Sequence, residues 1–321
     1  MLIVATAFWG LSFPITKALA ITQQELLSGG DSWFLASLCV VYRFALAAAI
    51  LLCFTIRTLA QITRAELIQG LGLGVFAGGG ILLQVDGLAH TSASTSAFLT
   101  QCSCALIPLW VAWRERRWPS PIVLLSCVLV SVGVAILADV NWRDFRLGRG
   151  EWETIAASIL FAGQILILAS PRYARNNTTH FSLVMFAMTA LVCLPVAILT
   201  TPQTADWVRI YRSAPALGML GILTLFCTLV GCLLMNRWQR HVTATEAGLI
   251  YCIEPVFASV LALFIPAWLS AWAAIDYANE RATVSLLIGG GLITAANILI
   301  QWPALSRRAG EVPNIYRDLR P

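Results

Sequence analysis

The sequence contains little charge. Asp, Glu, Lys and Arg make up 12% of its 321 residues, about half of what soluble domains carry. Hydrophobic residues make up 59%, and many apolar runs reach the roughly 20 residues that a membrane-spanning helix needs. This composition excludes an ordinary soluble protein. It predicts a multi-pass membrane protein whose spans are helices, because helices satisfy their backbone hydrogen bonds within the lipid.

Lysine and histidine are scarce, and enzyme motifs are missing. Lys17 is the single lysine, and the three histidines, His90, His180 and His241, fall in or beside predicted loops. The sequence has no HExxH motif, no Gly-x-Ser-x-Gly motif and no Walker A motif. We therefore expect no cofactor, no metal and no ATP-driven pumping, with a membrane-embedded enzyme or a receptor as distant alternatives. The basic residues lie in loops and in the tail, so no nucleic-acid partner is expected.

Ten apolar runs are long enough to predict membrane spans. Their approximate bounds are 2–21, 33–55, 66–85, 92–113, 121–138, 153–171, 180–200, 214–235, 244–265 and 283–303. The ninth run continues to residue 275 and would extend about 48 Å as one helix, well beyond a hydrocarbon core of about 30 Å. Pro266 offers a break, and the aromatic residues that follow it favour the membrane–water interface. We predict a short surface helix over 267–278.

The arginines predict the orientation of these spans. With the N-terminus in the cytoplasm, thirteen arginines fall on cytoplasmic segments and six on the opposite side. Cytoplasmic loops of membrane proteins carry this excess of positive charge. We expect a protein of the cell (inner) membrane with both termini in the cytoplasm.

The two halves of the chain resemble each other. Segment 7–12 parallels 159–164 at an offset of 152, and segment 90–93 parallels 241–244 at an offset of 151. Because five is an odd number of spans, the second half must enter the membrane from the opposite side, as in the inverted repeats of many secondary transporters. The predicted fold is all-α, with ten transmembrane helices as two inverted repeats. Its parts are a first five-helix repeat 1–138, an extracytoplasmic connecting loop 139–152, a second five-helix repeat 153–303 and a cytoplasmic tail 304–321.

Four motifs resemble those of one transporter family. Segment 9–17, Trp-Gly-Leu-Ser-Phe-Pro-Ile-Thr-Lys, resembles the first-helix signature of the EamA branch of the drug/metabolite transporter superfamily, and Tyr42-Arg43-Phe44 resembles its second helix. Segment 87–100 with Pro108 and the Arg-Glu-Arg of 114–116 resembles the third helix end, the fourth helix and the following loop. Glu254-Pro255-Val256-Phe257 resembles the ninth helix.

This resemblance implies ten helices, an inverted repeat, export or exchange of metabolites, and a cavity lined by both halves. The sequence departs from the family at two points. Asn279-Glu280 stands late in the chain where the family has Gly-Glu, and Glu246 is unexpected at its position. Glu246 is also explained as a solvated charge at a helix N-terminus, which the helix dipole favours.

Polar and aromatic residues that interrupt the apolar runs are the candidates for solute binding, because ionisable groups within a membrane are costly and need a reason. The candidates are Trp9, Ser12, Lys17, Arg43, Gln84, Thr100, Gln101, Phe161, Gln164, Tyr251 and Glu254.

Each candidate also has a structural interpretation. Arg43 either contacts an anionic solute or pairs with helix-end carbonyls or Glu254. Lys17 either attracts a carboxylate or extends to the interface, and Glu254 either carries a proton or belongs to a fixed ion pair. The uncharged polar groups either replace a solute's water or join helices. Trp9 and Phe161 occupy matching repeat positions and are either cavity walls or packing residues.

Two further features have structural predictions only. Gly70, Gly74 and Gly78 recur every four residues, a spacing that predicts close helix–helix contact. Asp86 is predicted to lie solvated at the outer membrane edge. Neither feature enters the predicted solute site.

The function predicted from these features is secondary transport, as exporter or exchanger, of a small metabolite such as an amino acid or derivative. The alternative within the superfamily is a sugar-phosphate or nucleotide-sugar carrier. A phosphate would call for several basic cavity residues, and the predicted spans of the second half contain none. The expected partners are the solute and the lipid bilayer, with a homodimer left open.

Overall fold

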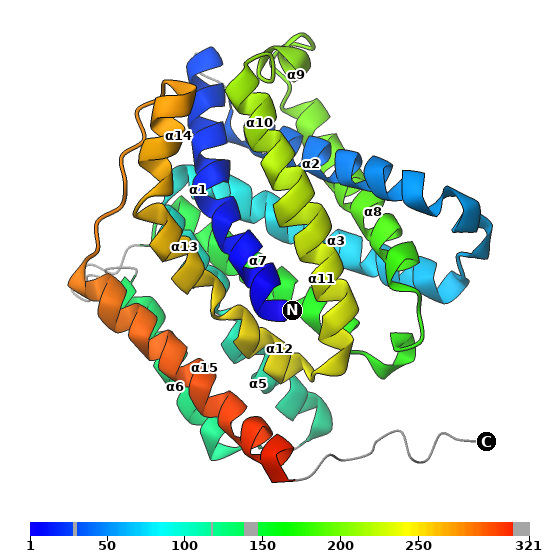
Figure 1. The fold of residues 1–321 in the computed structure, drawn as a ribbon, viewed down its shortest axis with the longest axis vertical. Coiled ribbons are helices and arrows are strands. Elements are labelled where there is room, and N and C mark those ends of the chain that lie inside the picture. The colour runs from blue at the N-terminus through cyan, green and yellow to red at the C-terminus, as the bar shows by residue number, and fades with distance from the viewer. Residues whose placement is uncertain (28–30, 117, 138–146, 311–321) are drawn as a thin grey trace.

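The chain folds into a bundle of helices, and no strand occurs in the part of the chain that the structure describes (Figure 1). The structure is a computed structural model that describes residues 1–27, 31–116, 118–137 and 147–310. The helices of the first half are α1 (Leu2–Leu26), α2 (Ser32–Thr55), α3 (Arg64–His90), α4 (Ala93–Thr100), α5 (Ser103–Glu115) and α6 (Pro121–Leu137). Those of the second half are α7 (Arg149–Leu168), α8 (Thr178–Leu199), α9 (Asp206–Arg209), α10 (Ala214–Ile222), α11 (Gly231–Trp238), α12 (Ala244–Tyr251), α13 (Glu254–Ala262), α14 (Ile265–Ala273) and α15 (Val284–Gly310).

Seven helical stretches of the described chain are long and apolar enough to cross a membrane. One of them, 214–241, combines α10 and α11 with a π-helical segment between them, η3 (Leu223–Val230). Pro121–Gly133 and Val284–Ala296 are shorter apolar helices. The run predicted as one span over 92–113 is divided into α4 and α5. The chain is thus an all-helical, multi-pass membrane protein.

Three boundaries differ from those predicted. The short helix predicted over 267–278 is α14, which ends at Ala273 because Ala274 adopts the left-handed conformation with φ 55°; its place at the membrane surface stays a prediction. Helix α7 begins at Arg149, within the predicted loop 139–152. Helix α15 continues to Gly310, into the predicted tail, whose residues 311–321 lie outside the described residues.

Side-chain caps recur at the starts of corresponding helices in the two halves. Asp31 caps α2 as Asn177 caps α8, each accepting a hydrogen bond from the amide two residues on. The remaining pairs accept from the amide three residues on, and they are Thr63 of α3 with Ser213 of α10, Ser92 of α4 with Thr243 of α12, and Ser120 of α6 with Thr283 of α15. Each cap satisfies an amide that a helix start leaves unpaired.

Helix α3 lies at the centre of the bundle, packed against α7 and α8 (Figure 1). Its glycines permit this contact. A Cβ at Gly70 would lie 2.5 Å from Val184 Cβ, and one at Gly74 would lie 2.5 Å from Met188 Cβ. The close helix contact predicted from the glycine spacing is confirmed.

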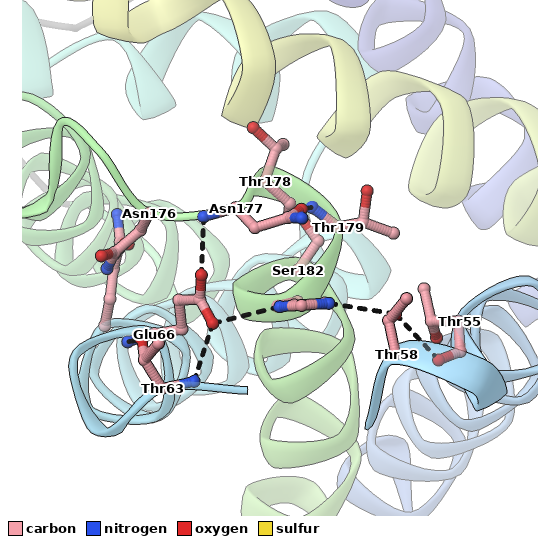
Figure 2. Close-up of polar contacts among 11 residues, drawn as sticks. Thr55, Thr58, Thr63, Glu66, Asn176, Asn177, Thr178, Thr179 and Ser182 are labelled. Carbon is pink, nitrogen blue, oxygen red and sulfur yellow. Dashed lines mark hydrogen bonds and ion pairs between the residues drawn. The ribbon is translucent and has the colours of Figure 1, made fainter. Parts of the chain in front are cut away.

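A buried polar cluster joins the start of α3 to the start of α8 (Figure 2). Glu66 accepts hydrogen bonds from the amides of Thr63 (2.9 Å) and Asn177 (2.8 Å). It also contacts His180 Nδ1 at 3.1 Å, and the other ring nitrogen of His180 lies 3.1 Å from Thr58 Oγ1. Both Glu66 and His180 are buried. Glu66 therefore stabilises two helix starts at once.

Replacing Glu66 by glutamine is expected to lower the free energy of unfolding by about 1.5–3 kcal/mol, the range for hydrogen bonds to a charged group. Glu246→Gln is the matched control, because Glu246 forms the same capping box with Thr243. Its described hydrogen bonds are only those of the cap, so its loss should be below about 1 kcal/mol. Denaturant unfolding in detergent measures both. Equal losses for the two variants would contradict the role given to the contacts with α8.

Candidate functional site

A cavity of about 100 Å³ lies within the bundle and contains ten of the eleven residues selected from the sequence. It is formed by α1, α2, α3, α7, η3 and α11, together with the junctions α4–α5 and α12–α13. The ten are Trp9, Ser12, Arg43, Gln84, Thr100, Gln101, Phe161, Gln164, Tyr251 and Glu254. The structure brings these side chains to one place from both halves of the chain. Their role in binding a solute stays a prediction.

Two helix interruptions border the cavity at corresponding positions of the halves. Helix α4 ends at Thr100 and α5 begins at Ser103, while α12 ends at Tyr251 and α13 begins at Glu254. The two interruptions are 151 residues apart at both edges. Interrupted helices at membrane depth expose backbone groups to a cavity, and transporters use them to contact solutes. Residues at the edges of both interruptions line this cavity.

Hydrogen bonds fix several of the uncharged polar side chains. Gln84 Nε2 donates to Thr100 Oγ1 at 2.9 Å, which joins α3 to α4. Tyr251 donates to Gln239 Oε1 at 2.8 Å, and Gln239 in turn donates to the carbonyl of Ile165 at 2.9 Å. Hydrogen bonds between helices therefore account for some of the polar side chains within the apolar runs. The same bonds hold Gln84, Thr100 and Tyr251 in place at the cavity wall.

Arg43 and Glu254 are the charged residues of the described cavity wall. Both are buried, with 6% and 8% of their surface exposed. Arg43 donates to Thr228 Oγ1 of η3, and its guanidinium lies over the ring of Phe44, 5.9 Å from the centroid. Glu254 hydrogen-bonds with Gln101 and is the first residue of α13, where the helix dipole favours a carboxylate. These two described residues form no ion pair with each other, so the pairing considered for them is absent.

Aromatic rings form a further part of the wall. The Trp9 ring meets Tyr251 edge-on with centroids 5.3 Å apart. Phe161 packs on Gly80, where a Cβ would lie 2.7 Å from the Phe161 ring. Trp9 and Phe161 thus contribute to the cavity from α1 and α7, and they also pack against neighbouring helices.

Lys17 lies apart from the other candidates. Its ammonium donates to the carbonyl of Thr91, just before α4. The carboxylate of Glu280 is close enough to act on its charge, and Glu280 also accepts a hydrogen bond from the amide of Ala93 at 3.1 Å. This arrangement gives Lys17 a role in holding the start of α4.

The comparisons with known proteins agree with this architecture. Residues 152–302 match the EamA-like transporter family. Through this segment, the second half of the chain is identified as a member of the EamA-like transporter family. An uncharacterized transporter of Archaeoglobus fulgidus is 22% identical to the EamA-like chain over 263 residues, covering 80% of this chain and 74% of that protein. A crystal structure of a protein at 16% identity superposes with a TM-score of 0.60 over 96% of this chain and 99% of its own, which shows the fold alone.

Membership confirms the resemblance drawn from the sequence motifs and makes this EamA-like protein a membrane transporter. A small-molecule solute and a lipid bilayer are its partners by that membership. The family and the transporter of similar sequence point to transport in place of enzymatic chemistry. Within the described residues, no group of three or more metal-ligating side chains is present.

Sequence reasoning missed part of the EamA-like cavity wall. The further lining residues are Phe44, Ile81, Ser103, Ile165, Cys227, Cys232 and Met235. Ser103 could have been selected from the sequence, because it is a polar residue within an apolar run. The other side chains are apolar or weakly polar and look like any packing residue of a span. Thr228, the partner of Arg43, was also missed and is polar in the same way as Ser103.

Proposed function

We propose that this protein is a secondary transporter, an exporter or exchanger, of an amino acid or a derivative. The observation that carries the proposal is the pair of buried ionisable side chains in one cavity. Arg43 comes from the first half and Glu254 from the second, and no ion pair joins them. A guanidinium and a carboxyl group in one small cavity complement the carboxylate and ammonium groups of an amino acid. A small cavity binds its solute through a few placed polar groups, which bond the polar groups of the solute in place of water.

The mechanism we infer is alternating access between two five-helix repeats. The matching caps support a duplication, because their offsets are 146, 150 and 151 for the first three pairs and 163 for the last. The increase of 12 residues falls between the third and fourth pairs, where α14 and its loop occur in the second half alone. The two helix interruptions share the offset of 151. Under this proposal, the divided helices α4–α5 and α12–α13 each count as one of ten spans.

Helix directions support an inverted relation between the repeats. Helix α3 runs parallel to α8, because Gly70, Gly74 and Gly78 face Val184, Met188 and Val192 in that order. Helix α11 and the turn that follows it run antiparallel to α8, because Asn236 of α11 bonds Ser182 and Arg240 of the turn bonds Thr178. Helix α3 is therefore antiparallel to α10–α11, its counterpart in the second half. Two such repeats can rock about a shared cavity.

We further propose that both termini face the cytoplasm of an inner-membrane protein. The excess of arginine on the segments assigned to that side supports this orientation. It places the Glu66 cluster at the cytoplasmic end of α3 and His90 at the outer end. A reporter fused to the C-terminus that proved active only outside the cytoplasm would contradict it.

The charge of the cavity favours amino acids over the phosphate-bearing solutes of the superfamily. A doubly charged phosphate needs several cations, and Arg43 is the single one on the described wall. The cavity volume of about 100 Å³ also favours a small solute over a nucleotide sugar.

Proteoliposomes containing the purified protein test the substrate class. We expect uptake of radiolabelled amino acids and no uptake of a labelled sugar phosphate. Empty liposomes and liposomes with Arg43→Gln protein provide the controls. Uptake of the sugar phosphate in preference to every amino acid tested would overturn the proposed class while leaving transport itself intact.

A further inference from the structure

Two carboxyl groups and one guanidinium meet where the end of α3 crosses the start of α7. Arg149 Nε donates to Glu153 Oε1 at 2.7 Å, and Arg149 Nη2 donates to Asp86 Oδ2. Asp86 is fully buried, with 0% of its surface exposed, which overturns the prediction that it is solvated. The guanidinium thus engages one oxygen of each carboxyl and brings the two groups together.

The other oxygen of each carboxyl is buried and receives no hydrogen bond from any donor among the described residues. These atoms are Asp86 Oδ1 and Glu153 Oε2. The two side chains lie within hydrogen-bonding contact of each other. Two ionised carboxylates have only acceptors between them, so this contact needs a proton. One shared proton would satisfy both orphan oxygens, as it does wherever two carboxyl groups share a site.

The charge balance also favours one proton. With both carboxyls ionised, the three groups carry a net charge of −1; with one proton they are neutral beside Arg149. Among the described residues, the neighbouring titratable and charged groups are engaged elsewhere. Glu151 of α7 accepts from Thr91, His90 of α3 contacts Ser32 of α2, Asp31 caps α2, Lys17 of α1 donates to the carbonyl of Thr91, and Glu280 accepts from Ala93 of α4.

The position of the pair connects it with the cavity. Asp86 follows the cavity residue Gln84 by two positions on α3, and Glu153 precedes the cavity residue Phe161 by eight positions, about 12 Å along α7. Close backbone contact of Gly87 with Gly150 lies beside the pair, since a Cβ on Gly87 would be 2.8 Å from the Gly150 carbonyl oxygen. Loss of the proton would place two like charges across this contact and favour separation of α3 from α7 at this end.

We propose that Asp86 and Glu153 form a proton-binding site that couples proton movement to opening of the cavity at this end of the bundle. The inference rests on the proposed transport function and deepens it by naming a coupling ion and its site. The protonated pair holds α3 against α7, and its deprotonation opens the path. Proton coupling is thereby assigned to this pair in place of Glu254, whose carboxyl bonds Gln101 and lines the cavity.

Infrared difference spectroscopy of the purified protein during a pH titration tests the site without transport. We expect a protonated-carboxyl band that titrates in the Glu254→Gln protein, which lacks the cavity carboxyl, and that disappears from it when Asp86→Asn or Glu153→Gln is added. Glu25→Gln is the control, because Glu25 is an exposed carboxyl near the same end of the bundle. In the Glu254→Gln background, a band that survives both Asp86→Asn and Glu153→Gln, or the absence of a band, would overturn the proposal.

Transport assays separate this proposal from the proposed function. Exchange of labelled for unlabelled amino acid without a pH gradient reports transport itself. In the wild type, we expect an imposed gradient to change net uptake about fivefold or more, the lower range of coupling between two sites. We expect Asp86→Asn and Glu153→Gln to lose this response and Glu25→Gln to keep it. If the wild type exchanged no amino acid, that result would contradict the proposed function. Exchange that does not respond to the pH gradient, or a response unaltered in Asp86→Asn, would contradict the proton site but not the transport function.

Discussion

Arg43→Gln is expected to weaken solute binding about 30-fold or more. Truncating one side of a buried, hydrogen-bonded charge pair costs about 2 kcal/mol or more, and 1.4 kcal/mol is a factor of ten. Arg43 is 6% exposed and lines the cavity, so water cannot replace it at a solute carboxylate. Isothermal calorimetry with an amino acid that the wild type binds measures the change.

Thr228→Val is the matched control for Arg43. It removes the described hydrogen-bond partner of the guanidinium but keeps the charge in the cavity. We expect it to reduce affinity less than tenfold. Loss of a single hydrogen bond to a charged group costs about 1.5–3 kcal/mol only when no other group replaces that bond. If Arg43 is structural, Arg43→Gln will instead lower the melting temperature of the solute-free protein and leave the affinity of the folded fraction unchanged. That outcome would remove Arg43 from the binding site.

Gly74→Ala is expected to destabilise the protein by about 1–3 kcal/mol, the usual cost of overpacking. The added methyl group would lie 2.5 Å from Met188 Cβ and 2.9 Å from the carbonyl oxygen of Met185. The nearest of these atoms belong to the backbone and Cβ of α8, so no flexible side-chain end can move aside. Helix α3 must then shift away from α8. The unfolding temperature in detergent reports the effect.

Gly72→Ala provides the comparison on the same helix. Its new methyl group would meet only the end of Ile167 at 3.4 Å, an ordinary contact. Alanine also favours helix over glycine by up to about 1 kcal/mol. We expect Gly72→Ala to be neutral or stabilising, and similar destabilisation by both variants would contradict tight packing of α3 on α8.

The sequence predicted the helical class, the cavity candidates and the glycine contact because each depends on a local pattern. Apolar runs mark spans, and polar residues such as Gln84 and Gln164 stand out within them. The interruption between α4 and α5 was not predicted, because segment 99–104 contains no proline or glycine that would mark it. The partner of Glu254 was also unpredictable, since Gln101 reaches it from another half of the chain.

Asp86 shows most clearly what the sequence pattern does not predict. Its place near the end of a span suggested solvent, and a neighbouring helix buries it instead. Which carboxyl meets which guanidinium depends on how α7 crosses α3, and no residue spacing encodes that crossing. Lys17 shows the same limit, because its partners Thr91 and Glu280 are distant from it in the sequence.

Accelerated exchange is the most direct test of a carrier with one cavity open alternately to two sides. Proteoliposomes preloaded with an unlabelled amino acid are compared with unloaded ones for uptake of the same labelled amino acid. Alternating access predicts faster uptake into the preloaded vesicles, because a cavity that carries unlabelled solute out of the vesicle can then bind labelled solute and carry it in. Equal uptake rates with and without preloading, at concentrations that saturate the wild type, would indicate a channel-like path and contradict alternating access.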